Sequence, residues 1–133
     1  MTLLRIVLSL HALSVLTQAV FAGQFLSGAD AQVVFHEWTA WAIFVLSLVQ
    51  VGIAVLLLLR SAAPLWLLVA SIFVLIAEGL QLGTGYGRFL GVHIPLGVFV
   101  FGTVTALMLW SLRSKPQLTR KDQVRKDAAS TGL

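Results

Sequence analysis

Residues 36–59, HEWTAWAIFVLSLVQVGIAVLLLL, contain a single charged side chain, Glu37. A helix of about 24 residues is roughly 36 Å long at about 1.5 Å per residue, which exceeds the roughly 30 Å of hydrocarbon in a bilayer. Three other stretches, at about 4–27, 64–84 and 91–112, are also long and apolar. Together with the second span, taken as 34–59, they predict four transmembrane helices.

The composition indicates the same class. Of the 133 residues, 59% are hydrophobic and 11% are charged, and the mean hydropathy is +0.97. A soluble domain of this length needs a more polar surface. The chain has no cysteine, which excludes disulfides, thiolate metal ligands and cysteine nucleophiles. We expect an all-α integral membrane protein in contact with the lipid bilayer.

The apolar region is internally repeated. A displacement of 57 residues aligns Gln24 with Gln81 and His36 with His93, and each histidine follows its glutamine by 12 residues. Duplicated hairpins are common in membrane proteins. The repeat predicts an up-down bundle of two hairpins over residues 1–113, with one histidine on each of the second and fourth helices.

The basic residues are unevenly distributed. Arg88 alone falls on one side of the predicted bundle, whereas the others flank the opposite side, namely Arg5, Arg60, Arg113, Lys115, Arg120, Lys121, Arg125 and Lys126. The positive-inside rule places both termini in the cytoplasm, at the cell membrane, and both histidines near the outer face. Residues 114–133 are expected to form a disordered basic cytoplasmic tail, whose charge suits anionic lipid rather than nucleic acid.

The first span also has features of a secretory signal, because Arg5 precedes an apolar run that ends in Ala22 and Gly23. This span carries His11 and Gln18, however, and its removal would delete half of one repeat. We therefore expect it to remain as the first helix of the bundle.

Helical spacing predicts the inward faces. On the second span, residues at intervals of four and three are mostly small or polar, namely His36, Ala40, Ile43, Ser47, Gln50 and Ala54. The fourth span has the same spacing at His93, Gly97, Val100 and Val104. Membrane helices pack through such stripes. Ala40 and Gly97, one turn beyond each histidine, either clear space for a flat ligand or serve ordinary close packing of helices.

Two histidines at one depth favour haem over a bare metal ion. A zinc site needs three or four protein ligands, and Glu37 lies about 100° around the helix from His36. Haem supplies four equatorial nitrogens and requires two axial ligands. His36 and His93 on diagonal helices therefore predict one b-type haem, with Arg88 as a cation for its propionates.

Four spans, an internal duplication and the motifs Phe35-His36-Glu37 and Val92-His93-Ile94-Pro95 resemble one half of haem A synthase and, more loosely, other small membrane b-type cytochromes. The resemblance covers about residues 10–112 and implies that the two histidines are axial ligands. The synthase has two four-helix units where this chain has one, so the likeness implies haem binding rather than the synthase reaction. The chain also resembles small actinobacterial four-span membrane proteins of unassigned function.

Polar residues within the predicted spans are candidates for a second site. Glu78 lies about 21 Å from the cytoplasmic end of its span and Gln18 reaches a similar depth. We expect either a hydrogen bond between Glu78 and Gln18 or a proton or quinone site. His11 and Gln50 are also expected to pair. Because Leu68 occupies the position equivalent to His11 in the third span, a second bis-histidine haem is not expected.

Together these features predict a membrane electron-transfer or haem-handling protein. Its partner would be a quinone or a redox protein, and the pattern is compatible with an oligomer. The alternative is a cofactor-free membrane scaffold or assembly subunit, in which His36 and His93 bond to backbone or lipid.

Overall fold

The computed structural model describes residues 1–114, Arg125 and residues 127–130. Its four long helices are α1 (Thr2–Leu26), α2 (Gln32–Leu59), α3 (Leu65–Tyr86) and α4 (Leu90–Arg113). All four are long and apolar enough to cross a membrane, as the sequence predicted. Most of the predicted tail lies outside the described residues, and those described beyond Ser114 have helical backbone conformation.

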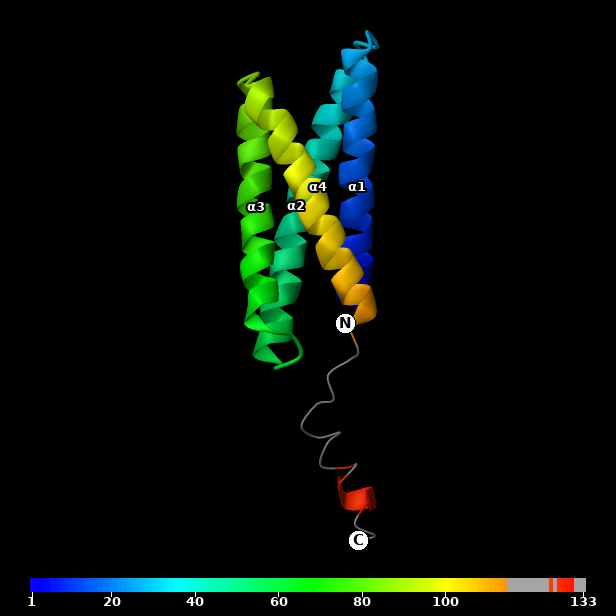
Figure 1. Ribbon diagram of the computed structural model, residues 1–133, viewed down its shortest axis with the longest axis vertical. Coiled ribbons are helices and arrows are strands. Elements are labelled where there is room, and N and C mark those ends of the chain that lie inside the picture. The colour runs from blue at the N-terminus through cyan, green and yellow to red at the C-terminus, as the bar shows by residue number, and fades with distance from the viewer. Residues whose placement is uncertain (115–124, 126, 131–133) are drawn as a thin grey trace.

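The helices pack in a closed ring. In the described part of the chain, α1 and α3 each pack against α2 and α4, but neither diagonal pair makes a close backbone approach. The chain reverses direction at each connection (Figure 1). The two helices that carry His36 and His93 are therefore diagonal partners.

The packed core occupies only one half of the bundle. Buried residues end at Val15 on α1 and at Glu78 on α3, and they begin at Ile43 on α2 and at Val100 on α4. Beyond this boundary, toward the two connections at residues 27–31 and 87–89, the α1–α2 hairpin diverges from the α3–α4 hairpin (Figure 1). We call the part with buried residues the packed half and the part beyond it the open half.

Small and polar side chains line the packed half, where they let helices approach closely. The predicted stripe of α2 is confirmed at four positions, all of them buried, namely Ile43, Ser47, Gln50 and Ala54. On α4 it is confirmed at Val100 and Val104. The remaining stripe residues lie in the open half and are partly exposed.

Arg5 joins the beginning of α1 to the end of α4. Its Nε donates to the carbonyl oxygen of Ser111 at 2.9 Å, and its Nη2 donates to that of Ser114 at 2.6 Å. The last carbonyls of a helix have no partner within the helix. Arg5 therefore closes the ring between α1 and α4 at the packed end.

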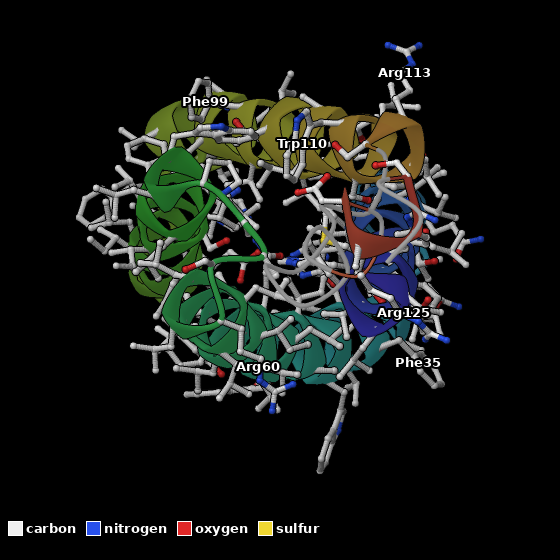
Figure 2. The ribbon with its side chains drawn as sticks, turned by 90° about the horizontal axis from the view of Figure 1, so that it is seen from below. Phe35, Arg60, Phe99, Trp110, Arg113 and Arg125 are labelled. Carbon is white, nitrogen blue, oxygen red and sulfur yellow. The ribbon has the colours of Figure 1, made fainter. Side chains whose placement is uncertain are left out.

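The outward surface is apolar. Trp38 is 72% exposed and Leu59 is 77% exposed, and Figure 2 shows Phe35 and Phe99 on the outer side of the ring of helices. Water solvates such a continuous apolar surface poorly. The buried polar side chains lie inside this apolar surface, as expected for a protein in lipid.

The second residue of each connection lies in the left-handed region, with φ of +96° at Gly28, +52° at Ser61 and +56° at Arg88. The next amide donates to a carbonyl in the preceding helix, as from Ala62 to Leu57 at 2.8 Å. This is the usual way to end a helix at a glycine. Helices α2 and α3 end in this way with Ser61 and Arg88, rather than glycine, at the position with positive φ.

Replacement of Ser61 by glycine should raise the free energy of unfolding by up to about 1 kcal/mol, because glycine adopts a positive φ without steric cost. Gly28→Ala, at the matching position of the first connection, should lower it by a similar amount. Thermal unfolding in detergent micelles, followed by circular dichroism, measures both. A less stable Ser61→Gly variant would contradict the prediction.

Candidate functional site

His36 on α2 and His93 on α4 meet inside the open half. Their ring centroids are 6.1 Å apart and their planes are inclined by 64°. Both side chains are partly exposed. The two imidazoles thus reach each other from diagonal helices whose backbones do not come close.

Both rings are oriented through Nδ1. This atom lies 3.1 Å from the carbonyl oxygen of Gln18 in His36, and 3.0 Å from that of Gln81 in His93. Because a carbonyl oxygen only accepts, each Nδ1 carries a proton, and in the neutral imidazole Nε2 keeps its lone pair. Metal-ligating histidines are usually held in this way, with the second ring nitrogen donating to a backbone carbonyl.

Glycine residues, which have no side chain, lie close to His93 and to Gln81. A Cβ atom on Gly85 would lie 3.0 Å from Cε1 of His93, so the ring packs where α3 has no side chain. A Cβ atom on Gly97 would lie 2.6 Å from Nε2 of Gln81. The clearance predicted for a flat ligand at Gly97 is therefore filled by the end of a flexible amide. Ala40, at the corresponding position of α2, is partly exposed.

The two histidines do not have equivalent partners. The backbone carbonyl of Gln81 accepts the hydrogen bond from His93. The repeat aligns Gln81 with Gln24, but the carbonyl that accepts from His36 belongs to Gln18. The first connection, residues 27–31, is longer than the third, residues 87–89. The displacement of 57 residues therefore aligns the histidines but not the residues that orient them.

Arg88 lies in the third connection, at the open end and five residues before His93, and is exposed. Within the described residues, no hydrogen bond or ion pair holds its guanidinium group, and no three histidine, aspartate or glutamate side chains gather as a metal site. A metal bound by the histidine pair would thus need further ligands from outside these side chains. Arg88 is available to an anionic group of a bound ligand.

A second polar cluster lies in the packed half. His11, Gln50 and Ser71 are 0% exposed and Glu78 is 4% exposed. Nδ1 of His11 lies 2.8 Å from Oε1 of Gln50, which confirms the predicted pairing. Nε2 of His11 lies 2.5 Å from Oε1 of Glu78, and Nε2 of Gln50 donates to Oγ of Ser71 at 3.1 Å.

The hydrogen-bond directions in this cluster place its protons. Ser71 donates to the carbonyl oxygen of Leu67 at 2.8 Å, so its Oγ accepts from the Gln50 amide, and the amide oxygen faces His11. Nδ1 of His11 must then donate to Gln50. One further proton is shared between Nε2 of His11 and Oε1 of Glu78, and the pair is neutral overall whichever atom holds that proton.

The prediction of a hydrogen bond between Glu78 and Gln18 is wrong. Oε1 of Gln18 accepts instead from the Thr39 hydroxyl on α2. Depth counted along each helix assumes parallel axes, but these helices are inclined to one another (Figure 1). The sequence did contain a signal for the observed pairing of His11 with Glu78. Both groups are ionisable and lie within the spans, and buried ionisable groups need partners of complementary charge.

A third contact, absent from the predictions, joins α2 and α3 on the outer surface. The Tyr86 hydroxyl donates to Oε1 of Glu37 at 2.6 Å and accepts from Nε1 of Trp41 at 3.1 Å. All three side chains are exposed. Glu37 is thereby bonded to α3 rather than directed into the histidine pair beside it.

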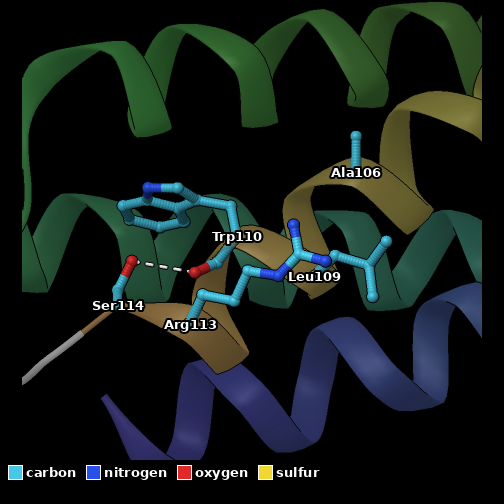
Figure 3. Close-up of a pocket in the computed structure, with 5 residues that line it drawn as sticks. All are labelled: Ala106, Leu109, Trp110, Arg113 and Ser114. Carbon is cyan, nitrogen blue, oxygen red and sulfur yellow. Dashed lines mark hydrogen bonds between the residues drawn. The ribbon is translucent and has the colours of Figure 1, made fainter.

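A pocket of about 510 Å³ lies at the opposite end of the bundle, near the end of α4 (Figure 3). It is lined by Ala106, Leu109, Trp110, Arg113 and Ser114. None of the predicted site residues contributes to it. The candidate site is therefore the histidine pair in the open half.

No protein-family model, no curated protein and no solved structure matches this chain. The functional conclusion therefore depends on the geometry of the site.

Glu78→Leu should lower the free energy of unfolding by about 1–3 kcal/mol, because it leaves a buried imidazole nitrogen without a partner. Glu78→Gln should cost clearly less, since an amide N–H can donate to Nε2 of His11. Denaturation in micelles compares the two variants. Equal losses would show that the hydrogen bond to His11 does not contribute to stability.

Proposed function

We propose that this chain is a multi-pass protein of the cell membrane that binds one b-type haem between His36 and His93 and serves electron transfer or haem handling. The observation that carries the proposal is the facing pair of imidazoles, each with Nδ1 bonded to a backbone carbonyl and Nε2 free. The likeness to one half of haem A synthase points the same way.

The spacing of the rings fits axial ligation. Two imidazoles that bind one iron from opposite sides, with metal–nitrogen bonds of about 2 Å, have centroids about 6 Å apart. The observed separation is 6.1 Å. His36 lies seven residues before Ile43, and His93 seven before Val100, the first buried residues of their helices, so about 10 Å of helix separates each histidine from the packed core.

The open half also offers suitable surroundings. Its inward residues are only partly buried, so a flat apolar ring would cover them, provided that the flexible Gln81 amide moves from Gly97. Arg88 at the open end would pair with the propionates. His36, His93, Ala40, Gly97 and Arg88 are thus the residues that we assign to haem.

The bound haem would supply a one-electron redox centre. The chain itself would contribute two axial nitrogens, made more basic by the bonds from Nδ1 to backbone carbonyls, and an apolar pocket that excludes water. None of these residues makes or breaks a covalent bond with a substrate. The function therefore requires an electron-carrying partner, either a quinone or a redox protein.

In the membrane we propose an up-down bundle of two related hairpins with both termini in the cytoplasm. The excess of basic residues at the end of the packed half supports this orientation. The open half, with both histidines, would then face the outer side.

The purified protein should show the absorption spectrum of a low-spin haem, with a Soret band and a sharp α band on reduction. His36→Gly and His93→Gly should each abolish the low-spin form, because each removes one axial ligand. Added imidazole should restore it by occupying the vacated space. Glu37→Gln, which changes the exposed neighbour of His36, is the matched control and should keep the spectrum.

A protein that stays colourless in haem-replete cells and does not respond to added haemin would refute haem binding. That result would favour the cofactor-free scaffold, in which the histidines only bridge α2 and α4.

The orientation has its own test. A reporter fused after Leu133 should be active in its cytoplasmic form, because most basic residues flank that end of the bundle. Activity of a reporter that functions only outside the cytoplasm would reverse the orientation and place the histidines near the inner face.

A further inference from the structure

Two buried oxygen atoms without partners lie between the histidine site and the packed core. Within the described residues, Oε2 of Glu78 and Oε1 of Gln81 have no hydrogen-bond partner. The two residues are about one helical turn apart on α3, and the backbone carbonyl of Gln81 holds His93. An unpaired buried polar atom is costly, so these atoms call for a role in the molecule.

Glu78 is also the last buried residue of α3 before the open half. Its carboxyl group is bonded to His11, four residues inside the boundary at Val15, so it lies within the packed half close to the open half. The His11–Glu78 pair, already sharing one proton at 2.5 Å, has a second carboxyl oxygen on which another proton can bind.

We infer that the His11–Glu78 pair binds a proton more tightly when the site between His36 and His93 gains one electron, so that this chain couples electron transfer to proton binding. The inference rests on the proposed function. It makes the pair a proton-binding site, distinct from the axial ligands.

The step balances in charge and atoms. A haem held by His36 and His93 would accept the electron, which dithionite supplies in the test. One proton from water binds Oε2 of Glu78, and the shared proton moves fully to Nε2 of His11. The product is an imidazolium hydrogen-bonded to a neutral carboxyl group, and the total charge of the buried region is unchanged.

The coupling follows from distance. The histidines lie about 10 Å along the helix axis from the core boundary, and two unit charges about 10 Å apart at an effective dielectric constant of about 20 change each other's binding constants by about tenfold. An electron at the histidine site therefore favours a proton at Glu78 by about this factor.

No other group around the pair competes for this proton. The side chain that bonds to the pair from α2 is Gln50, and α3 adds Ser71, neither of which titrates. The buried residues of α4 are likewise without charge, namely Val100, Val104, Leu107 and Ser111. Among these described residues, only His11 and Glu78 themselves can bind the proton.

The test is the midpoint potential of the haem-loaded protein as a function of pH. Because reduction brings a proton, the potential should fall as pH rises, by a total equivalent to about tenfold in the equilibrium constant, or about 59 mV for one electron. The double variant His11→Gln with Glu78→Gln carries amides at both positions, which can form hydrogen bonds but cannot bind the proton, and its potential should not vary over that range. Glu37→Gln, the control glutamate outside the core, should behave as the unaltered protein.

A second readout needs no assumption about the stability of the variants. The infrared difference spectrum between reduced and oxidised protein should contain a carboxyl C=O band that is present with Glu37→Gln and absent with Glu78→Gln. A potential independent of pH in the unaltered protein, or a dependence that persists in the double variant, would overturn the inference while leaving haem binding intact. A protein that binds no haem would overturn the proposed function and this inference together.

Discussion

The hydrogen bond between His11 and Glu78 joins α1 to α3, two diagonal helices that do not pack directly against each other. Two ionisable groups in an apolar core are costly unless each neutralises the other. Gln50 extends the pair to α2 and is itself satisfied by Ser71. Three helices are thereby fixed in one relative position within the packed half. The approach of His36 to His93 in the open half depends on this arrangement, because His36 lies on the continuation of α2 and His93 is held by the carbonyl of Gln81 on the continuation of α3.

The sequence predicts those features of the fold that depend on neighbouring residues. Hydropathy is summed along one segment, so four helices of membrane-spanning length follow from the sequence alone. The period of 3.6 residues is equally local, which is why Ser47, Gln50 and Val104 could be placed on buried faces before the structure was considered. The proximity of His36 and His93 follows from these local features and one further assumption, that four consecutive helices pack in a square.

The partners of individual side chains depend on properties that no single segment contains. Helix inclination brings His11 rather than Gln18 to Glu78. Connection length makes Gln18 rather than Gln24 the acceptor for His36, because residues 27–31 form a longer link than residues 87–89. The left-handed conformation of Ser61 likewise has no signal in its residue type, since serine usually avoids a positive φ.

The division into a packed half and an open half gives the two polar sites different physical roles. A core along the full length of the bundle would stabilise the apo protein but would leave no space between α2 and α4 at the level of the histidines. With the core limited to one half, the packing of that half does not involve the space between the histidines. The partly exposed inward faces of the open half can then be covered by a ligand, whose binding would add stability by mass action. Loss of that ligand should therefore loosen the open half first, while the network around His11 continues to hold the packed half together.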